Sequence, residues 1–435
     1  MATFTKIDDG EQPVITVNSA HKISKIEDNT HMGRCIYGGI YDPGSPLSDE
    51  NGYRKDVIAA FQELKCPVVR YPGGNFIATY HWQDGVGPRE KRPKRQELAW
   101  HGIETNEFGT DEFLKWCEIV GTEPYLALNF GTGTLEEALG WLEYCNSDCD
   151  SYYANLRRQN GREKPYGAYQ WAKALKLLDP SVELILCGKD GPTHWDYYVT
   201  KECINYIQHA LGNNDSSCLI DMHSIHIYTA SDDHYKNATA PRQAERAIEI
   251  TSSLIDLARI ENGVPTKIKK QKICFDEWNV WDPIRAPGWL GAEEKYTLSD
   301  ALAVANWLNV LVRQSKHIGM ATIAQSSTWW PLLLFSKYMR GHTIAAHVQS
   351  GDAAVDDAGT TSLVVVNIHQ EIDFRTKVEG IPAGSPVDVY TVTGPSIQST
   401  NTNGAQEVGI AESQWTAEQF YVFPKLSMTM LRWKA

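Results

Sequence analysis

The chain has 435 residues, of which 42% are hydrophobic and 22% charged, and its net charge is −13. This composition is typical of a soluble globular protein with a full core, and the length predicts one large domain with a smaller one. A surface that acidic repels phosphate backbones and anionic lipid, so nucleic acid and membranes are excluded as expected partners.

The N-terminal stretch MATFTKIDDGEQ lacks a charged start followed by an apolar core, and no apolar run is long enough to span a bilayer. We therefore expect no signal peptide and a cytoplasmic location. The nine cysteines form no C-x-x-C pair, which favours reduced thiols. No metal site and no organic cofactor is indicated.

Short apolar runs alternate with helix-like stretches through most of the chain. The predicted strands are 35–40, 66–71, 124–129, 183–188, 222–228, 272–277 and 320–325. The predicted helices include 54–65, 110–121 and 299–314, the last with Ser299 as its N-cap. Strands that are apolar on both faces and alternate with helices indicate a parallel sheet covered by helices. Residues 27–335 therefore predict an α/β domain, a (β/α)₈ TIM barrel.

Several predicted strands end in a polar residue, and in a barrel these ends meet at one mouth, where chemistry is done. They are Arg70, Asn129, His226 with Tyr228, Glu277 and Gln325. Ordinary strand-end polar residues that face water are the alternative explanation.

Side-chain alternation makes further predictions for two of these strands. His226 and Tyr228 share one face, whereas His223 lies on the other, so the two histidines cannot bind one metal. In CFDEWNVW, alternation puts Phe275 and Glu277 on one face, and we expect that face to be the barrel interior. A buried carboxylate is costly unless it is used or paired, so Glu277 is a candidate for chemistry.

The sequence pattern changes after about residue 336, from alternating strands and helices to strands alone. The runs 362–369, 386–394 and 426–433 are β-rich and are separated by Gly, Pro and Asn turns. Residues 336–435 therefore predict an antiparallel β-sandwich, to which part of residues 1–26 adds strands.

The barrel part contains seven predicted strands rather than eight. After the run 124–129 comes a predicted helix at 135–146. The segment 155–180 that follows begins as a loop and continues as another helix. Either one segment is misread, or the fourth barrel strand is missing.

Taken together, the motifs resemble glycoside hydrolase family 51, the α-L-arabinofuranosidases of the intracellular type. The matching stretches are GRCIYGGIYDPGSPLSDENGYRKDV, RYPGGNF, YHWQDGVGP, LAWHGIETNEFGTDEFLKWC, SIHIYT and FDEWNVW, with the strand that ends at Gln325. The resemblance implies a TIM barrel with a C-terminal β-sandwich. It also implies retaining hydrolysis of terminal α-L-arabinofuranosyl residues from arabinan and arabinoxylan fragments, often by a homo-oligomer, a hexamer in the family.

The resemblance assigns roles by position. Glu277 matches the nucleophile. The residues that match the arabinose pocket are Arg70, Asn75, Trp100, His226, Tyr228, Trp281 and Gln325. A retaining glycosidase needs a second carboxylate about 5 Å away as acid and base.

In the family that second residue is the Glu of an Asn-Glu pair that ends the fourth strand. Here PYG (165–167) joins directly to AYQWAKAL (168–175), and no acid/base Glu is found. The expectation is therefore an arabinofuranosidase that is impaired by this absence. The alternatives are a catalytically inactive arabinose-binding protein and a retaining glycosidase of another specificity.

Overall fold

The structure is a computed structural model of the chain. It describes residues 14–25, 30–33, 36–99, 102–166, 182–204, 206–208, 216–281, 296–324, 329–340, 342–347, 352–356, 358–401 and 406–434. No helix within these ranges is both long and apolar enough to cross a membrane.

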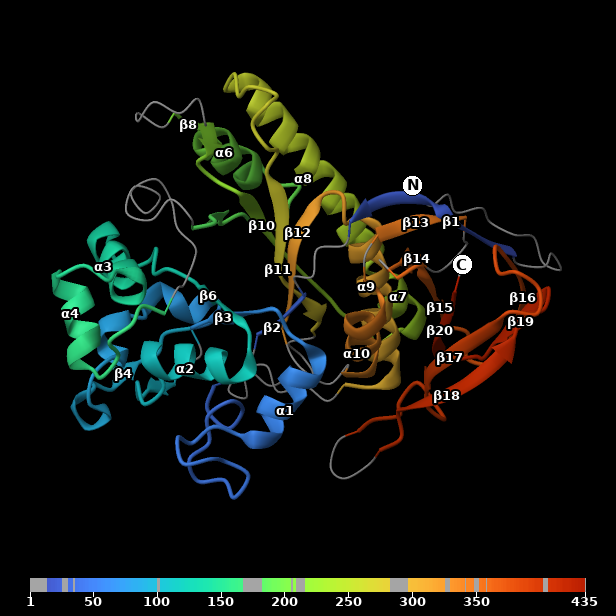
Figure 1. Cartoon of the computed structure of the whole chain (residues 1–435), viewed down its shortest axis with the longest axis horizontal. Helices are drawn as coiled ribbons and strands as arrows, with labels where there is room; N and C mark the ends of the chain where they lie inside the picture. The colour runs from blue at the N-terminus through green and yellow to red at the C-terminus, as the bar shows by residue number, and fades with distance from the viewer. Residues whose placement is uncertain are drawn as a thin grey trace.

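Parallel strands form the centre of the first part of the chain (Figure 1). The described ones are β2 (Thr30–Gly33), β3 (Val68–Tyr71), β6 (Glu123–Leu126), β7 (Ile185–Leu186), β10 (Met222–Thr229), β11 (Lys272–Val280) and β12 (Ile318–Ala324). The order β2-β12-β11-β10-β7 makes one sheet, β3 pairs with β6, and β2 lies beside β3. This arrangement fits the wall of a barrel.

One apolar layer connects these strands on their common inner side. It consists of Val68, Tyr125, Ile185, Met222, Cys274 and Met320, one residue from each of six strands. Layers of inward side chains of this kind fill the interior of a (β/α)₈ barrel. The site described below lies at the C-terminal ends of the same strands.

Between β6 and β7 the described residues form the helices α3 (Leu135–Asn146) and α4 (Tyr152–Gln159) and no strand. Residues 167–181 lie outside the described ranges. The absence of a fourth barrel strand therefore stays a prediction.

Helices cover the outer side of the strands. They are α1 (Lys55–Leu64), α2 (Thr110–Val120), α6 (His194–Cys203), α7 (His234–Thr239), α8 (Arg242–Glu261), α9 (Leu298–Arg313) and α10 (Trp329–Tyr338). The shorter elements are η1 (Asn75–Thr79), η2 (Trp82–Gly85), η3 (Arg89–Lys91), β4 (Arg95–Gln96), β5 (Ile103–Glu104), β8 (Tyr206–Gln208) and β9 (Ser216–Cys218).

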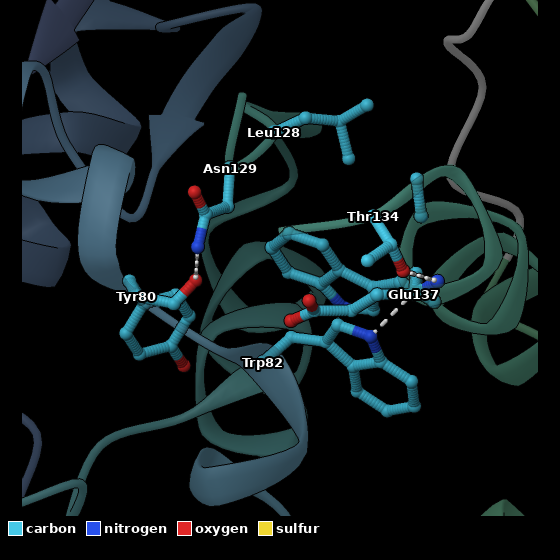
Figure 2. Close-up of a pocket in the computed structure, with 8 residues that line it drawn as sticks. Tyr80, Trp82, Leu128, Asn129, Thr134 and Glu137 are labelled. Carbon is cyan, nitrogen blue, oxygen red and sulfur yellow. Dashed lines mark hydrogen bonds between the residues drawn. The ribbon is translucent and has the colours of Figure 1, made fainter. Parts of the chain in front are cut away.

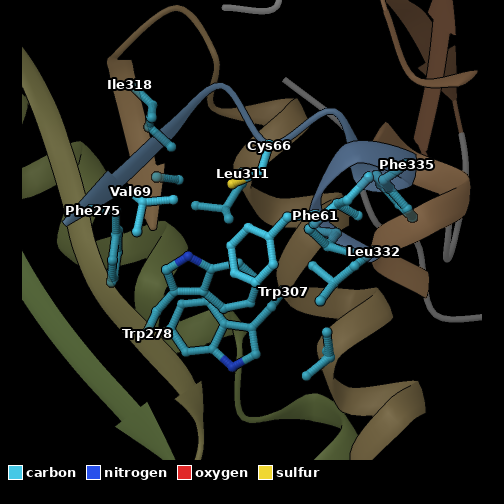
Figure 3. Packing of buried hydrophobic residues seen from close by; sticks show 14 of the residues in the cluster. Phe61, Cys66, Val69, Phe275, Trp278, Trp307, Leu311, Ile318, Leu332 and Phe335 are labelled. Atoms are coloured by element: carbon cyan, nitrogen blue, oxygen red, sulfur yellow. The ribbon is translucent and has the colours of Figure 1, made fainter. Parts of the chain in front are cut away.

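Aromatic side chains pack helix α9 against strand β11. Trp307 of α9 is fully buried, and its ring centroid lies 5.5 Å from that of Phe275 and 5.3 Å from that of Trp278 on β11. Figure 3 shows this group beside Phe61 of α1 and Leu332 of α10. The outer face of β11 is therefore fixed by packing on α9.

Two local predictions were wrong. Residues 36–40 form a turn rather than part of a strand, because Gly38 takes a left-handed backbone (φ +75°) and the Tyr41 N–H donates to the Ile36 carbonyl (2.8 Å). The N-cap of α9 is Thr297, whose N–H donates to Asp300 (2.9 Å), whereas Ser299 binds His234 (2.8 Å).

Among the described residues the C-terminal strands and β1 form one nine-stranded sheet, coloured orange to red in Figure 1 apart from the blue β1. Its strands are β1 (Val14–Lys25), β13 (His342–His347), β14 (Asp352–Val355), β15 (Thr360–Asn367), β16 (Phe374–Glu379), β17 (Pro386–Thr393), β18 (Gly409–Thr416), β19 (Phe420–Phe423) and β20 (Ser427–Lys434). Their order is β18-β17-β20-β15-β14-β13-β1-β16-β19, and β1 pairs with β13 and β16.

This sheet folds back on itself. Val378 and Phe423 belong to β16 and β19 at one end of the sheet, yet they pack with Leu363, Val389 and Leu431 from the other half. The opposite side of β15, β17 and β20 joins the large core that contains α9. The expected boundaries, 27–335 and 336–435 with part of 1–26, stay a prediction.

Candidate active site

A β-bulge in β11 creates the site. Three steps along β11, from Cys274 to Glu277, match two steps on β10, from Ser224 to His226. Such a bulge places one extra residue in a strand and redirects its side chains. As a result the consecutive residues Asp276 and Glu277 both reach the same cation, Arg70.

The bulge corrects the face predicted for this strand. Cys274, not Phe275, belongs to the inner layer, and Phe275 packs outward on Trp307. Strict alternation from Cys274 would point Glu277 outward, towards the helices. Glu277 reaches the site because the extra residue restores it to the inner side.

Arg70 at the end of β3 bridges the two carboxylates. Its Nη1 lies 3.0 Å from Oδ2 of Asp276, and its Nη2 donates to Oε1 of Glu277. The three side chains are 13%, 4% and 18% exposed, so these ion pairs are largely shielded from water.

Strand β10 brings two further side chains to the same place, as alternation predicts. The Tyr228 hydroxyl donates to Oε2 of Glu277 (3.0 Å). His226 lies between the carboxylates, with Nε2 3.0 Å from Asp276 and Nδ1 3.6 Å from Glu277. His223 points the other way, to Asp196 of α6 (3.1 Å), and so the two histidines do not meet.

The charges set the protonation states. Burial alone would raise the pKa of Glu277, but Arg70 and His226 hold it below its ordinary value. Burial likewise opposes ionisation of Asp276, yet His226 and Arg70 keep its pKa far below the usual range. Burial would lower the pKa of His226, and Asp276 outweighs it, so that this pKa is raised. Both carboxylates are therefore ionised at neutral pH.

Gly74 and Asn75 follow β3 at the edge of the site. A Cβ on Gly74 would lie 2.7 Å from Oε1 of Glu277, so only glycine allows this close approach. Asn75 begins η1 and is exposed.

Trp281 follows β11, and its ring packs edge-on against Tyr228 at 5.5 Å. Its buried indole N–H has no hydrogen-bond partner in the described part of the chain. Trp100 and Gln325, the remaining pocket residues predicted from the sequence, lie outside the described residues.

The sequence reasoning missed Asp276, Ser224 and Tyr125. Ser224 donates to Oδ1 of Asp276 (2.5 Å), and Tyr125 donates to its Oδ2 (3.1 Å). The available signal was the pair of adjacent acidic residues after a buried run. Neither can be buried without a partner, and regular alternation would have sent one of them into the helix layer.

Asn129 turns out to have a local role. Its side-chain oxygen accepts from the N–H groups of Gly131 and Thr132 (3.0 and 2.8 Å), and its amide donates to the Tyr80 carbonyl (3.0 Å). Figure 2 shows it at a small pocket between the loops after β3 and β6, where Glu137 and the Trp82 indole also meet.

The arrangement suits nucleophilic rather than acid catalysis. Glu277 is ionised, oriented by Arg70 and Tyr228, and placed at the strand ends. Asp276 is fully enclosed and ionised, so it has no proton to donate. A carboxylate with this environment can attack an electrophilic carbon.

Comparison with known proteins identifies the class. The model described as the α-L-arabinofuranosidase 1 domain matches residues 60–173, and that of the α-L-arabinofuranosidase C-terminal domain matches 276–327 and 323–427. α-L-Arabinofuranosidase C of Emericella nidulans is 56% identical, over 100% of both chains.

Two solved structures agree with this. The α-L-arabinofuranosidase of Thermotoga maritima in complex with arabinose is 31% identical, covers 98% of this chain and 100% of its own, and has a TM-score of 0.85. The family 51 enzyme of Thermotoga petrophila is 30% identical, covers 97% and 100%, and has a TM-score of 0.83. The chain belongs to the α-L-arabinofuranosidases of glycoside hydrolase family 51.

The alignment with the Emericella protein runs over 507 positions. Since the chain has 435 residues, at least 72 of these positions carry none of its residues.

Proposed function

We propose that this chain is a retaining glycoside hydrolase that removes terminal non-reducing α-L-arabinofuranosyl residues from arabinan- and arabinoxylan-derived saccharides. The observation that supports it best is the ionised Glu277 held by Arg70 and Tyr228 at the mouth of the strands. Membership of the α-L-arabinofuranosidases supports α-L-arabinofuranose as the sugar.

In this mechanism one oxygen of Glu277 attacks the anomeric carbon, and the bond to the leaving oxygen breaks. The product is a glycosyl-enzyme ester, which water then hydrolyses with retention. Arg70 and Tyr228 fix the attacking carboxylate. The unpartnered Trp281 indole N–H is a donor for a sugar hydroxyl, and Asn75, Trp100, His226 and Gln325 complete the proposed pocket.

We further propose that the chain lacks the acid/base carboxylate and is impaired for that reason. Three observations support this. Asp276, the carboxylate that shares Arg70 with Glu277, is ionised. The described residues between β6 and β7 contain no strand. At least 72 aligned positions carry no residue of this chain.

The test compares two substrates on the purified chain. An aryl α-L-arabinofuranoside with an activated leaving group needs little acid assistance, whereas an arabino-oligosaccharide needs a proton donor. General acid help is worth about 10²–10⁴ in rate, so we expect turnover of the aryl substrate alone. Turnover of both at comparable rates would refute the impairment.

Glu277→Gln is the matched control, because it keeps the size of the side chain and removes the nucleophile. It should abolish turnover of the aryl substrate. Unchanged activity in this variant would refute the assignment of Glu277. Arabinose binding by calorimetry without any turnover would instead indicate an inactive sugar-binding protein.

A further inference from the structure

Asp276 connects four strands at the site. Its carboxylate accepts from Arg70 of β3 (3.0 Å), Tyr125 of β6 (3.1 Å) and Ser224 of β10 (2.5 Å), and it contacts His226 of β10 (3.0 Å). The side chain is 4% exposed. A buried anion with several charge-assisted contacts has a fixed orientation and is costly to disturb.

These contacts determine how His226 faces Glu277. The ionised carboxylate of Asp276 can only accept, so Nε2–H of His226 donates to it (3.0 Å), and the ring turns Nδ1 towards Oε2 of Glu277 at 3.6 Å. If the ring were neutral, Nδ1 would present a lone pair to a carboxylate. Only the imidazolium has a proton on both sides, one for each anion.

Asp276 also limits how strongly Glu277 is held. Two cations, Arg70 and His226, face Glu277, and the charge of Asp276 balances one of them. Without Asp276 the charge of Arg70 would act on Glu277 alone and reduce its nucleophilicity, because a carboxylate that is more stabilised attacks less readily.

We propose that Asp276 is a positioning residue of this site, which keeps His226 as an imidazolium turned towards Glu277 and divides Arg70 between the two carboxylates. The link to catalysis rests on the proposed function. The protonation of His226 does not, and it can be measured without turnover.

The charged groups that act on His226 are Asp276, Glu277 and Arg70. Further titratable groups face the same carboxylates: Tyr125 of β6 donates to Asp276, Tyr228 of β10 donates to Glu277, and the thiol of Cys187, just after β7, feels both carboxylates. Of these groups, Asp276 is the anion that contacts Nε2 directly, and an opposite charge at such a distance raises the pKa of a histidine.

The first measurement is an NMR titration of the full chain with ¹³C-labelled histidine. The signal of His226 among the 13 histidines is identified by its loss in His226→Asn. We expect a midpoint above the ordinary value of about 6.5. A midpoint at or below that value overturns the proposal, with no other variant needed.

The second measurement compares Asp276→Asn with Ser224→Ala. The first removes the charge at nearly constant size, whereas the second removes one neutral donor to the same carboxylate. We expect the His226 midpoint to fall by at least about one unit in Asp276→Asn and by much less in Ser224→Ala. Equal shifts, or none, contradict the proposal. Unchanged signals of the other histidines control for folding.

Kinetics on the aryl arabinofuranoside test the consequence. Asp276→Asn should lower kcat/KM about 10–100-fold and move the alkaline limb of its pH profile to lower pH, in step with the NMR midpoint. A loss of activity with the limb unmoved would indicate a merely structural role. If wild type shows no turnover, the proposed function fails while the NMR result still decides the role of Asp276.

Discussion

Replacement of Arg70 by methionine tests the charge balance of the site through stability. Methionine keeps most of the length of the side chain and removes the cation that contacts both Asp276 and Glu277. Breaking a buried ion pair typically costs about 3–5 kcal/mol. Since His226 still faces both carboxylates, we expect the lower end, a loss of about 3 kcal/mol in unfolding free energy near pH 7.

The loss should depend on pH in a definite direction. In wild type the folded-state pKa values of Asp276 and Glu277 are depressed, so their stabilisation is present above the unfolded values and is lost as pH falls through the folded ones. Without Arg70 both pKa values lie higher than in wild type, because one of the two cations that oppose the effect of burial is gone. The variant then takes up protons as pH falls, and its deficit relative to wild type shrinks.

Urea unfolding of both proteins at about pH 7 and about pH 5 measures this. Lys337→Met is a suitable control, because it removes an exposed cation that pairs with Glu63 at 3.0 Å. That pair should be worth less than about 1 kcal/mol. If Arg70→Met costs no more than the control, or costs the same at both pH values, the reasoning about the buried charges is wrong.

Three other changes have definite expected outcomes. Gly74→Ala should lower kcat/KM on an aryl arabinofuranoside at least about 10-fold, because the new Cβ meets Glu277 at 2.7 Å, whereas Gly409→Ala, with open space around its Cβ, should not. Trp307→Phe should lower the unfolding free energy measured in urea by about 1–3 kcal/mol, because the smaller ring makes less contact with β11 and the indole donor to Thr229 (3.0 Å) is lost. An unchanged unfolding free energy would contradict that packing. Glu245→Gln should remove part of the acid sensitivity of folding. Burial opposes ionisation of the Glu245 carboxyl, but Arg313 holds its pKa below the ordinary value, so the stabilisation that this carboxylate provides is lost as pH falls. Equal pH dependence of unfolding in the variant and in wild type would contradict this role.

The local pattern of apolar residues was enough to locate most of the parallel strands. Apolar runs gave six of the seven described parallel strands within a few residues, and regular alternation on β10 placed His226 and Tyr228 on one side of it. These predictions succeed because period-2 alternation and apolar runs are set by nearby residues and by burial on both faces.

The bulge could not be predicted in this way. Alternation has a fixed period of two, so it gave the wrong inward residue on β11, Phe275 instead of Cys274, and overlooked Asp276. The fold-back of the C-terminal sheet, which joins Val378 to Leu431, depends on contacts far apart in sequence. The strand expected at 35–40 failed because Gly38 permits a turn there.

The pairing of β1 with β13 and β16 has a consequence for synthesis on the ribosome. Strand β1 leaves the ribosome long before its partners, because it ends at Lys25 and they begin at His342 and Phe374. At about 5–20 residues per second, β1 waits roughly 15–65 s for its first partner. During that interval the parallel strands and their helices emerge in order and can assemble. The β domain can close only when its last strands arrive, so a stalled chain exposes β1 as an unpaired edge.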